Sequence, residues 1–352
     1  METIRSEHSG VLMLDELLGI PAPSGWEGNM AAEIGKRVSP LGWTYRNDAA
    51  GNVLVDIPGS NPQGPVCCLA AHMDEIGMTV TNIDPDGRLR IDRSGGLYPW
   101  KLGEGPVEVF ARDTSIPGLL SFGSTHVPNA GERKATWDEA SILTGVNAEQ
   151  LAKLGVGIGN PVLPVRERRG PFLFGSEELP WVGAWTLDNR MGIIALLQLL
   201  EEIRRQEIVP HCPTLVAFTV EEEIGGYGAK FLAQREQPEV LIAVDGCPVP
   251  PGAPLQLDGR PGIRTKDRAA IYDPYLLDDI CRLAKRAGVG LQPVAYTSSA
   301  SDASLAHVVG VAPRIASVGY VRESSHGYDA TPIASFDNLL ATLLAFIRNW
   351  KG

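Results

Sequence analysis

Short runs of apolar residues that end in an acidic residue or a histidine recur along this chain. Three of these runs, Pro65–Ala71, Thr214–Val220 and Val240–Val244, are strongly apolar, and Arg314–Gly319 is a weaker fourth. Apolar runs of this length that are bounded by glycine are typical of strands buried on both faces of a sheet. The pattern therefore predicts four strands of one buried sheet.

Longer amphipathic segments lie between these runs and after them. Asn189–Gln206, Pro274–Ala287 and Phe336–Trp350 each place apolar residues on one helical face and charged residues elsewhere. Asp273 followed by Pro274 is a typical helix start, because aspartate accepts hydrogen bonds from first-turn amides and proline suits the first helical position. Strands that alternate with helices predict an α/β fold, in which ligands gather at the carboxyl ends of the strands.

One long segment breaks this alternation. It is rich in glycine and proline, and short alternating runs, such as the hairpin pattern over residues 78–91, replace helices there. We therefore predict a discontinuous α/β domain formed by residues 1–77 and 179–352, with an inserted β-rich module over residues 78–178.

Composition narrows the class of protein. The 352 residues include 31 Lys and Arg against 42 Asp and Glu, a formal net charge of −11, and 44% are apolar while 21% are charged. These proportions are typical of a globular protein rather than a disordered one. Because nucleic acids and anionic membrane surfaces attract clustered Lys and Arg, the acid surplus argues against both kinds of partner.

Three further features bear on location. The start, METIRSEHSG, has no apolar stretch, so we expect no secretory signal peptide. The longest apolar stretches, such as Gly192–Leu200, are about half of the ~20 residues that a membrane span needs. The five cysteines are an odd count without CxxC spacing, which is typical of a reduced, cytoplasmic protein.

Polar residues with metal-binding chemistry follow the predicted strands or open the long helix. They are His72, Asp74, Asp188, Glu222, Glu223, Asp245 and His326. Taken alone, each has an ordinary alternative role, for example a helix N-cap for Asp188 or a turn residue for Asp245. Together, two histidines and several carboxylates at one edge of a sheet suit zinc, cobalt or manganese. A free glutamate beside a ligating one can act as general base, so the pattern predicts a metallohydrolase.

Six segments carry a family resemblance. They are AHMDEIGMTV (71–80), TLDNRMG (186–192), FTVEEEIGGYGA (218–229), VDGCP (244–248), SDAS (301–304) and SSHGYD (324–329). In content, order and spacing they resemble the tetrahedral aminopeptidases, a family of two-metal glutamyl and leucyl aminopeptidases that are often labelled endoglucanases. The resemblance implies a zinc-exopeptidase-like mixed sheet sandwiched by helices, with an inserted PDZ-like β-barrel domain that builds dimers and often a hollow dodecamer.

The resemblance also implies a set of metal ligands. His72, Asp188 and Asp245 would hold one divalent ion, and Asp188, Glu223 and His326 would hold the second, with Asp188 shared between them. Zinc or cobalt is expected at both positions, and manganese also suits these ligands.

Other roles follow from the same resemblance. Glu222 is expected to act as general base, and Asp74 to accept the other ring N–H of His72 and so fix its tautomer. Asp302 is expected near the substrate. His126, in the inserted module, is either an ordinary histidine of the surface or core, or a residue that reaches the active site of a neighbouring subunit.

We therefore predict a cytoplasmic, homo-oligomeric aminopeptidase that releases N-terminal residues from short peptides by metal-activated water. A related di-metal deacylase or amidohydrolase is the first alternative, although those families place their extra domain after the glutamate pair. A glycosidase is less favoured, because glycoside hydrolysis uses paired carboxylates and usually no metal. The last alternative, a non-catalytic assembly protein, does not explain why the general base and every expected ligand are retained.

Overall fold

Four parallel strands form the middle of an eight-stranded sheet. In the computed structural model, which describes residues 7–352, the strand order is β1-β2-β12-β3-β13-β17-β15-β16. The parallel strands are β12 (Thr214–Thr219), β3 (Cys67–His72), β13 (Val240–Val244) and β17 (Arg314–Gly319). Nearly all of their residues are buried, as their unbroken apolar sequences predict.

The outer strands make the sheet mixed. β1 (Tyr45–Asn47) and β2 (Val53–Ile57) extend it in antiparallel fashion beyond β12, while β15 (Gly262–Lys266) pairs antiparallel with β17 and parallel with β16 (Gln292–Ala295). This arrangement confirms the predicted α/β fold class. Residues 1–6, part of the start that is expected to carry no signal peptide, lie outside the described residues.

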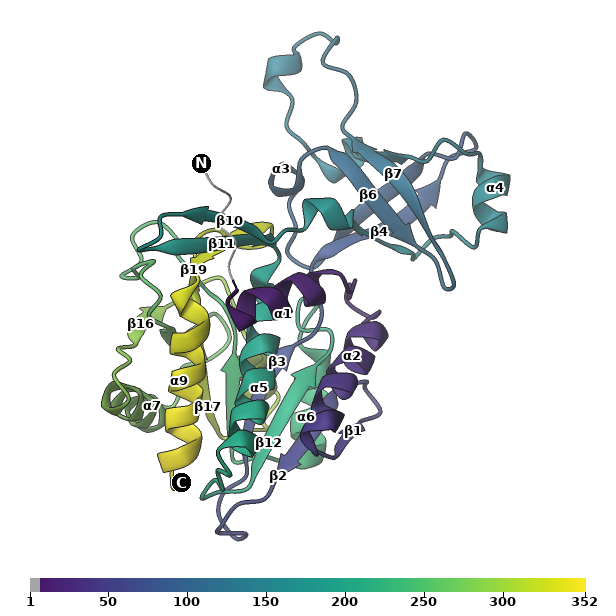
Figure 1. Ribbon diagram of the computed structural model, residues 1–352. Coiled ribbons are helices and arrows are strands. Elements are labelled where there is room, and N and C mark those ends of the chain that lie inside the picture. Colours follow the sequence, from purple (N-terminus) through teal and green to yellow (C-terminus); the bar gives the residue numbers. More distant parts are fainter. Residues whose placement is uncertain (1–6) are drawn as a thin grey trace.

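One group of helices is centred on the long helix of the sequence pattern (Figure 1). That helix, α5 (Leu187–Arg205), packs on β3 and against α1 (Ser9–Leu18), α2 (Gly28–Val38) and α9 (Ala334–Asn349). Because α5 is buried along most of its length, it joins the sheet to the other helices of this group in one continuous apolar core.

A second group of helices completes the α/β body. α8 (Asp302–His307) packs on β3, β13 and β17, and α6 (Tyr227–Glu236) packs against α8. α7 (Pro274–Arg286) packs against α9. α7 begins as predicted, since the Asp273 carboxylate accepts hydrogen bonds from two first-turn N–H groups. Within residues 7–352, none of the helices has both the length and the apolar character that crossing a membrane would require.

The segment that breaks the α/β pattern forms a closed barrel, which Figure 1 shows projecting from the α/β body. Its strands, in the barrel order β4-β5-β8-β7-β6-β9, are β4 (Gly77–Ile83), β5 (Leu89–Ser94), β8 (Ser141–Leu143), β7 (Ser115–Ser121), β6 (Gly105–Phe110) and β9 (Pro161–Pro164). The barrel has an apolar core distinct from that of the sheet. It also carries two short helices, α3 (Pro99–Leu102) and α4 (Ala148–Lys153), and Asn147 caps α4.

Two small sheets lie outside both the eight-stranded sheet and the barrel. β10 (Phe172–Gly175), β11 (Pro180–Trp185) and β19 (Tyr328–Pro332) form an antiparallel sheet, and β14 (Cys247–Pro248) pairs with β18 (Val321–Arg322). β10 lies in one sheet with β11 and β19, which belong to the predicted α/β domain, although the residues of β10 fall within the predicted inserted module. Because β11 leads directly into α5, the chain returns from the barrel at the start of that helix.

A buried ion cluster stabilises this junction. Glu75, just after β3, is fully buried and accepts hydrogen bonds from Arg169, from Arg190 at 2.8 Å and from the Ala22 N–H at 2.9 Å. Arg190 also donates to the carbonyl of Met73 at 2.7 Å. The cluster therefore ties the end of β3 to α5 and to the chain that returns from the barrel.

We predict that Glu75→Gln lowers the free energy of unfolding by about 3–5 kcal/mol, because two buried guanidinium groups lose the charge that compensates them. Urea denaturation at pH 7 measures the change. The matched control is Glu149→Gln, which removes an exposed carboxylate paired with Lys153 and should change the free energy by about 0.5 kcal/mol or less. Equal effects of the two substitutions would contradict the role given to the cluster.

Candidate metal centre

The polar residues predicted from the sequence converge at the carboxyl edge of the parallel strands. Thr219, the last residue of β12, pairs with His72, the last residue of β3, so the loop with Glu222 and Glu223 begins beside His72. Asp245 follows β13 directly. All five expected metal ligands and Glu222 line one cavity of about 620 Å³.

The two nitrogens of the His72 ring have different surroundings. Nδ1 lies 3.1 Å from the backbone carbonyl oxygen of Asp74 and 3.4 Å from its carboxylate Oδ1, while Nε2 lies 3.3 Å from Oδ1 of Asp188. Asp74 is thus the partner of Nδ1, as the sequence analysis expects, and its backbone carbonyl is the nearer acceptor. An Nδ1–H that donates to this carbonyl leaves Nε2 available as a metal ligand.

The Asp74 carboxylate instead holds the backbone of the glutamate loop. It accepts hydrogen bonds from the N–H groups of Glu222 at 2.9 Å and Glu223 at 3.1 Å, and from the Ser24 hydroxyl at 2.7 Å. Because the group is fully buried, these bonds replace the water that the carboxylate loses. Asp74 therefore orients the two residues expected to act as general base and ligand.

A second buried acid, Glu27, holds the backbone of the same loop one residue earlier, at Glu221. Its carboxylate accepts the N–H of Glu221 at 3.1 Å and the N–H of Gly25 at 2.9 Å. Glu221 has φ 54°, a left-handed conformation that is unfavourable for a residue with a side chain. Three successive amides of the loop are thus held by acids from other elements. Sequence reasoning did not identify Glu27, because a glutamate just before a helix carries no distinctive signal.

The start of α5 departs from helical geometry at the point where it reaches the cavity. Asp188 and Asn189 have non-helical backbone angles, and the peptide between them is cis. The Asn189 side chain donates to the carbonyl of Val244 at 2.8 Å and accepts the N–H of Gly192 at 3.0 Å. Asn189 rather than Asp188 therefore caps the regular part of the helix, and the Asp188 carboxylate is left to line the cavity.

The barrel contributes a backbone group to the site. His326, in the loop before β19, has Nδ1 3.1 Å from the carbonyl oxygen of Gly96 and Nε2 3.6 Å from Oε2 of Glu223. Gly96 follows β5 of the barrel, and a Cβ atom at this position would lie 2.2 Å from Nδ1. The close approach therefore requires glycine. The second imidazole, like the first, turns Nε2 toward a carboxylate.

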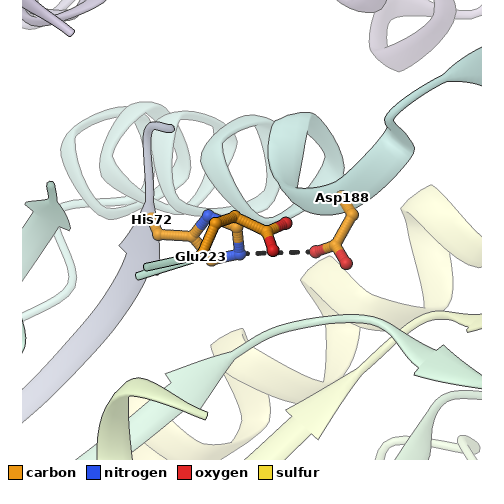
Figure 2. A group of neighbouring side chains, drawn as sticks. All are labelled: His72, Asp188 and Glu223. Atoms are coloured by element: carbon orange, nitrogen blue, oxygen red, sulfur yellow. Dashed lines mark ion pairs between the residues drawn. The ribbon is translucent and has the colours of Figure 1, made fainter. Parts of the chain in front are cut away.

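Three of the expected ligands form a compact group (Figure 2). One ligand atom each from His72, Asp188 and Glu223 lies within 4.8 Å of the others. Oδ1 of Asp188 is buried and has no hydrogen-bond donor. Such an oxygen beside an imidazole nitrogen and a second carboxylate suits a divalent cation, because nitrogen and oxygen ligands of this kind bind zinc, cobalt and manganese. Asp245 and His326 line the same cavity outside this group.

The electrostatics of the protein groups alone also favour a cation. Burial raises the pKa of Glu222 well above its usual value, and the charges of Asp302, Glu223 and Asp245 add to this effect against that of His72. Burial and Asp188 likewise raise the pKa of Glu223. Carboxylates that repel one another in a buried cavity are stabilised by a nearby positive charge.

Asp302 and His126, like Asp74, do not line the cavity. Asp302 begins α8, is buried, and accepts the Thr219 hydroxyl at 2.5 Å. Burial raises its pKa to about 7. His126 lies in an exposed loop of the barrel, where its N–H donates to the Ser124 hydroxyl at 3.0 Å. Contact of Asp302 with a substrate and reach of His126 to a neighbouring subunit stay predictions.

Two buried arginines of the site escaped the sequence analysis. Arg322, in β18, donates to Asp188 and, at 2.6 Å, to Asp329. Arg264, in β15, donates to Asp245 at 2.9 Å. The sequence carried no clear signal for them, because β15 also contains Thr265 and Lys266 and β18 is only two residues long.

We predict that Glu27→Gln stabilises the protein at high pH but not at low pH. Burial, and then the charge of Asp74, raises the pKa of Glu27 from 4.5 to about 7 in the folded protein. The folded state thus binds this proton more tightly, so wild-type stability falls as the pH rises from about 4.5 to 7. Glutamine keeps an accepting oxygen and carries no charge. Thermal unfolding of both proteins at pH 5 and pH 8 tests this prediction. A difference in melting temperature between Glu27→Gln and the wild type that does not grow with pH would contradict it.

Both the sequence and the fold have counterparts among known proteins. The model of the M42 glutamyl aminopeptidase family matches residues 51–341. The glutamyl aminopeptidase of Lactococcus lactis subsp. cremoris is 27% identical over 333 residues, which cover 92% of this chain and 91% of the relative.

Solved structures agree with this match. A TET aminopeptidase from a marine sediment archaeon of the Thaumarchaeota has a TM-score of 0.88 at 20% identity, with 97% of this chain and 98% of that chain covered. The TET1 peptidase of Pyrococcus horikoshii, which can assemble into a tetrahedron or a large octahedral shell, has a TM-score of 0.84 at 25% identity, with 96% and 99% covered. Since the family match spans most of its length, this chain is a peptidase of the M42 glutamyl aminopeptidase family.

Proposed function

We propose that the chain is a metal-dependent aminopeptidase that removes N-terminal residues from short peptides. The observation that carries this proposal is the convergence of His72, Asp188 and Glu223 beside Glu222 in one cavity. Membership of the M42 family and the name of the Lactococcus lactis relative support peptide hydrolysis from the N-terminus.

The donor set supports two divalent ions, as the sequence analysis expects. His72, Asp188 and Asp245 would hold one ion, and Asp188, Glu223 and His326 the other. Zinc, cobalt and manganese all suit nitrogen and oxygen donors of this kind. When bound, such ions would polarise the scissile carbonyl group and lower the pKa of a water molecule.

Glu222 is the residue proposed to move the proton. Its carboxyl group is half-buried and has a raised pKa, and a carboxylate of higher pKa is the stronger base toward the attacking water. The same carboxyl group then delivers the proton to the leaving amine. The backbone hydrogen bond from Glu222 to Asp74 keeps the loop in position for both steps.

The cavity supports a small substrate. Its volume of about 620 Å³ falls in the range of roughly 300–1,000 Å³ that is common for small-molecule sites. Gly96 and Tyr98 of the barrel segment line part of its wall. A few residues of a peptide fit such a space, whereas a folded protein does not.

Two alternative activities are distinguished by substrate. A deacylase or amidohydrolase would use the same chemistry but would not need a free α-amine. A glycosidase would not explain two imidazoles with Nε2 turned toward carboxylates. Assays of aminoacyl-anilides, N-acetylated anilides and cellulose side by side, with and without a chelator, distinguish the aminopeptidase from the deacylase or amidohydrolase and from the glycosidase.

Self-association and a cytoplasmic location belong to the same proposal. We infer that the inserted module of residues 78–178 contributes the contacts between subunits, in dimers and in a dodecamer. Large exposed apolar side chains of this module, Trp100, Leu119 and Ile158, support such an interface. The assemblies of the Pyrococcus horikoshii peptidase also support it.

Glu222→Gln should lower kcat by about 10²–10⁴-fold, the usual contribution of a general base, while metal content stays unchanged. Turnover of an aminoacyl-anilide and metal analysis of the purified protein give the two readouts. Glu221→Gln, in the adjacent residue, is the matched control and should keep wild-type turnover. Full activity of Glu222→Gln would refute the assigned role.

Removal of metal should abolish hydrolysis and make the protein easier to unfold. A bound ion stabilises only the folded state, so the melting temperature should fall after chelation and rise again with added zinc, cobalt or manganese. Dialysis against a chelator, followed by metal analysis, calorimetry and peptide assays, measures both effects. Undiminished hydrolysis by protein shown to be metal-free would exclude the proposed chemistry.

A further inference from the structure

We propose that Lys101 binds the free C-terminal carboxylate of a short peptide, so that the enzyme selects substrates by their length and by an unblocked C-terminus. This inference rests on the proposed function, because it concerns the far end of the same substrate. It follows from the contacts of one lysine of the barrel segment with the loop before β19.

Lys101 lies in α3 and reaches the loop that carries His326. Its Nζ donates to the Ser324 hydroxyl at 2.5 Å, and Ser324 lines the cavity two residues before His326. The stem of the lysine follows the same loop, since a Cβ atom at Gly327 would lie 3.4 Å from its Cδ. The ammonium therefore lies at the edge of the cavity, on the side of His326.

No acid neutralises the charge of Lys101 within residues 7–352. Its ammonium contacts the Ser324 hydroxyl and the face of Trp100, whose ring centroid lies 5.4 Å from Nζ, and it forms no ion pair with a carboxylate of this part of the chain. An ammonium has three N–H donors, so one bond to a neutral hydroxyl leaves donors for a ligand. A half-buried cation without a counter-ion points to an anionic ligand.

A short peptide supplies such an anion. At neutral pH it carries a positive amine at one end and a carboxylate at the other. Under the proposed function, the metal centre and the acids of the cavity act on the scissile carbonyl group and the amine. The carboxylate is then the remaining main-chain charge, and Lys101 offers the opposite charge at the edge of the same cavity. Screening of such a pair is weaker at a partly buried position than in water.

The fixed position of the ammonium makes this contact depend on peptide length. Each added residue moves the carboxylate of an extended peptide about 3.3–3.6 Å farther from the scissile bond. One ammonium at the edge of a cavity of about 620 Å³ therefore meets the carboxylate of only one or two peptide lengths. In longer peptides a neutral peptide group takes this place, and the ionic contact is lost.

Arg268 is the rival cation, because it lines the cavity and has no ion-pair partner within residues 7–352. Its side chain is exposed, and its one hydrogen bond in this part of the chain is from its backbone N–H to the carbonyl of Ser299 at 2.9 Å. An ammonium already held by Ser324 loses less conformational entropy on binding than a free guanidinium. The structure therefore favours Lys101.

The test compares substrates that differ at the C-terminus. They are X-Gly-Gly, its C-terminal amide and the anilide of X, where X is the N-terminal residue whose anilide the wild type hydrolyses fastest. A series from X-Gly to X-Gly-Gly-Gly-Gly tests length. Chromatography of released X gives kcat and KM for the peptides, and absorbance gives them for the anilide.

The variants are made in the metal-loaded full chain. Lys101→Met removes the charge, and Lys101→Arg keeps it. Lys153→Met is the matched control, because Lys153 is an exposed lysine of the barrel helix α4 and pairs with Glu149. Arg268→Met tests the rival cation.

In the wild type, we expect the amide to have a KM about 10-fold higher than that of the free acid at similar kcat, because one charge-assisted hydrogen bond has an effect of this size. Lys101→Met should raise the KM of X-Gly-Gly to that of its amide and leave the anilide, which has no carboxylate, unchanged. Lys101→Arg and Lys153→Met should keep the difference. The dependence of kcat/KM on peptide length should be lost in Lys101→Met alone.

Equal KM values for acid and amide in the wild type would overturn the inference, and this comparison needs no variant to fold. A difference that survives Lys101→Met would overturn it as well. Loss of the difference in Arg268→Met but not in Lys101→Met would assign the carboxylate to Arg268 instead. Wild-type protein that hydrolyses neither anilides nor peptides would refute the proposed function, whereas hydrolysis without any preference for the free acid would refute only the role of Lys101.

Discussion

Repulsion among buried carboxylates is the constraint on which the rest of this structure depends. Asp188, Glu222, Glu223 and Asp245 line one cavity, and burial together with their neighbours raises the pKa of all but the first. Burial also acts to raise the Asp188 pKa, but Arg322, His72 and His326 together outweigh it and lower this pKa. Positive charge, whether from arginine or from divalent ions, is what allows so many acids to lie together.

A second set of acids acts on the backbone rather than on a cation. Asp74 and Glu27 bind three successive amides of the glutamate loop, and Glu75 joins the arginines of the barrel junction. The segment directly after β3 thus contributes to the site, to the loop and to the junction between the barrel and the α/β body. A change in the packing of β3 would disturb all three.

The sequence predicted the buried strands and the long helix well, because both follow from local apolar patterns. It also placed the cavity residues, because ligands gather at strand ends. Asp74 was expected to accept a ring N–H of His72, and the structure adds that its backbone carbonyl is the nearer acceptor. The cap of α5 proved to be Asn189. Both details depend on the paths of loops, which local patterns do not specify.

By itself, the sequence determined the fold class, the chemistry of the donors and their order along the chain. Periodicity and side-chain type act within a few residues of each other, and both can be read from one segment. Only the tertiary structure decided that Arg264 lies on Asp245 and that Gly96 of the barrel reaches His326. The first contact forms when the strands of the sheet assemble, and the second forms when the barrel packs against the α/β body.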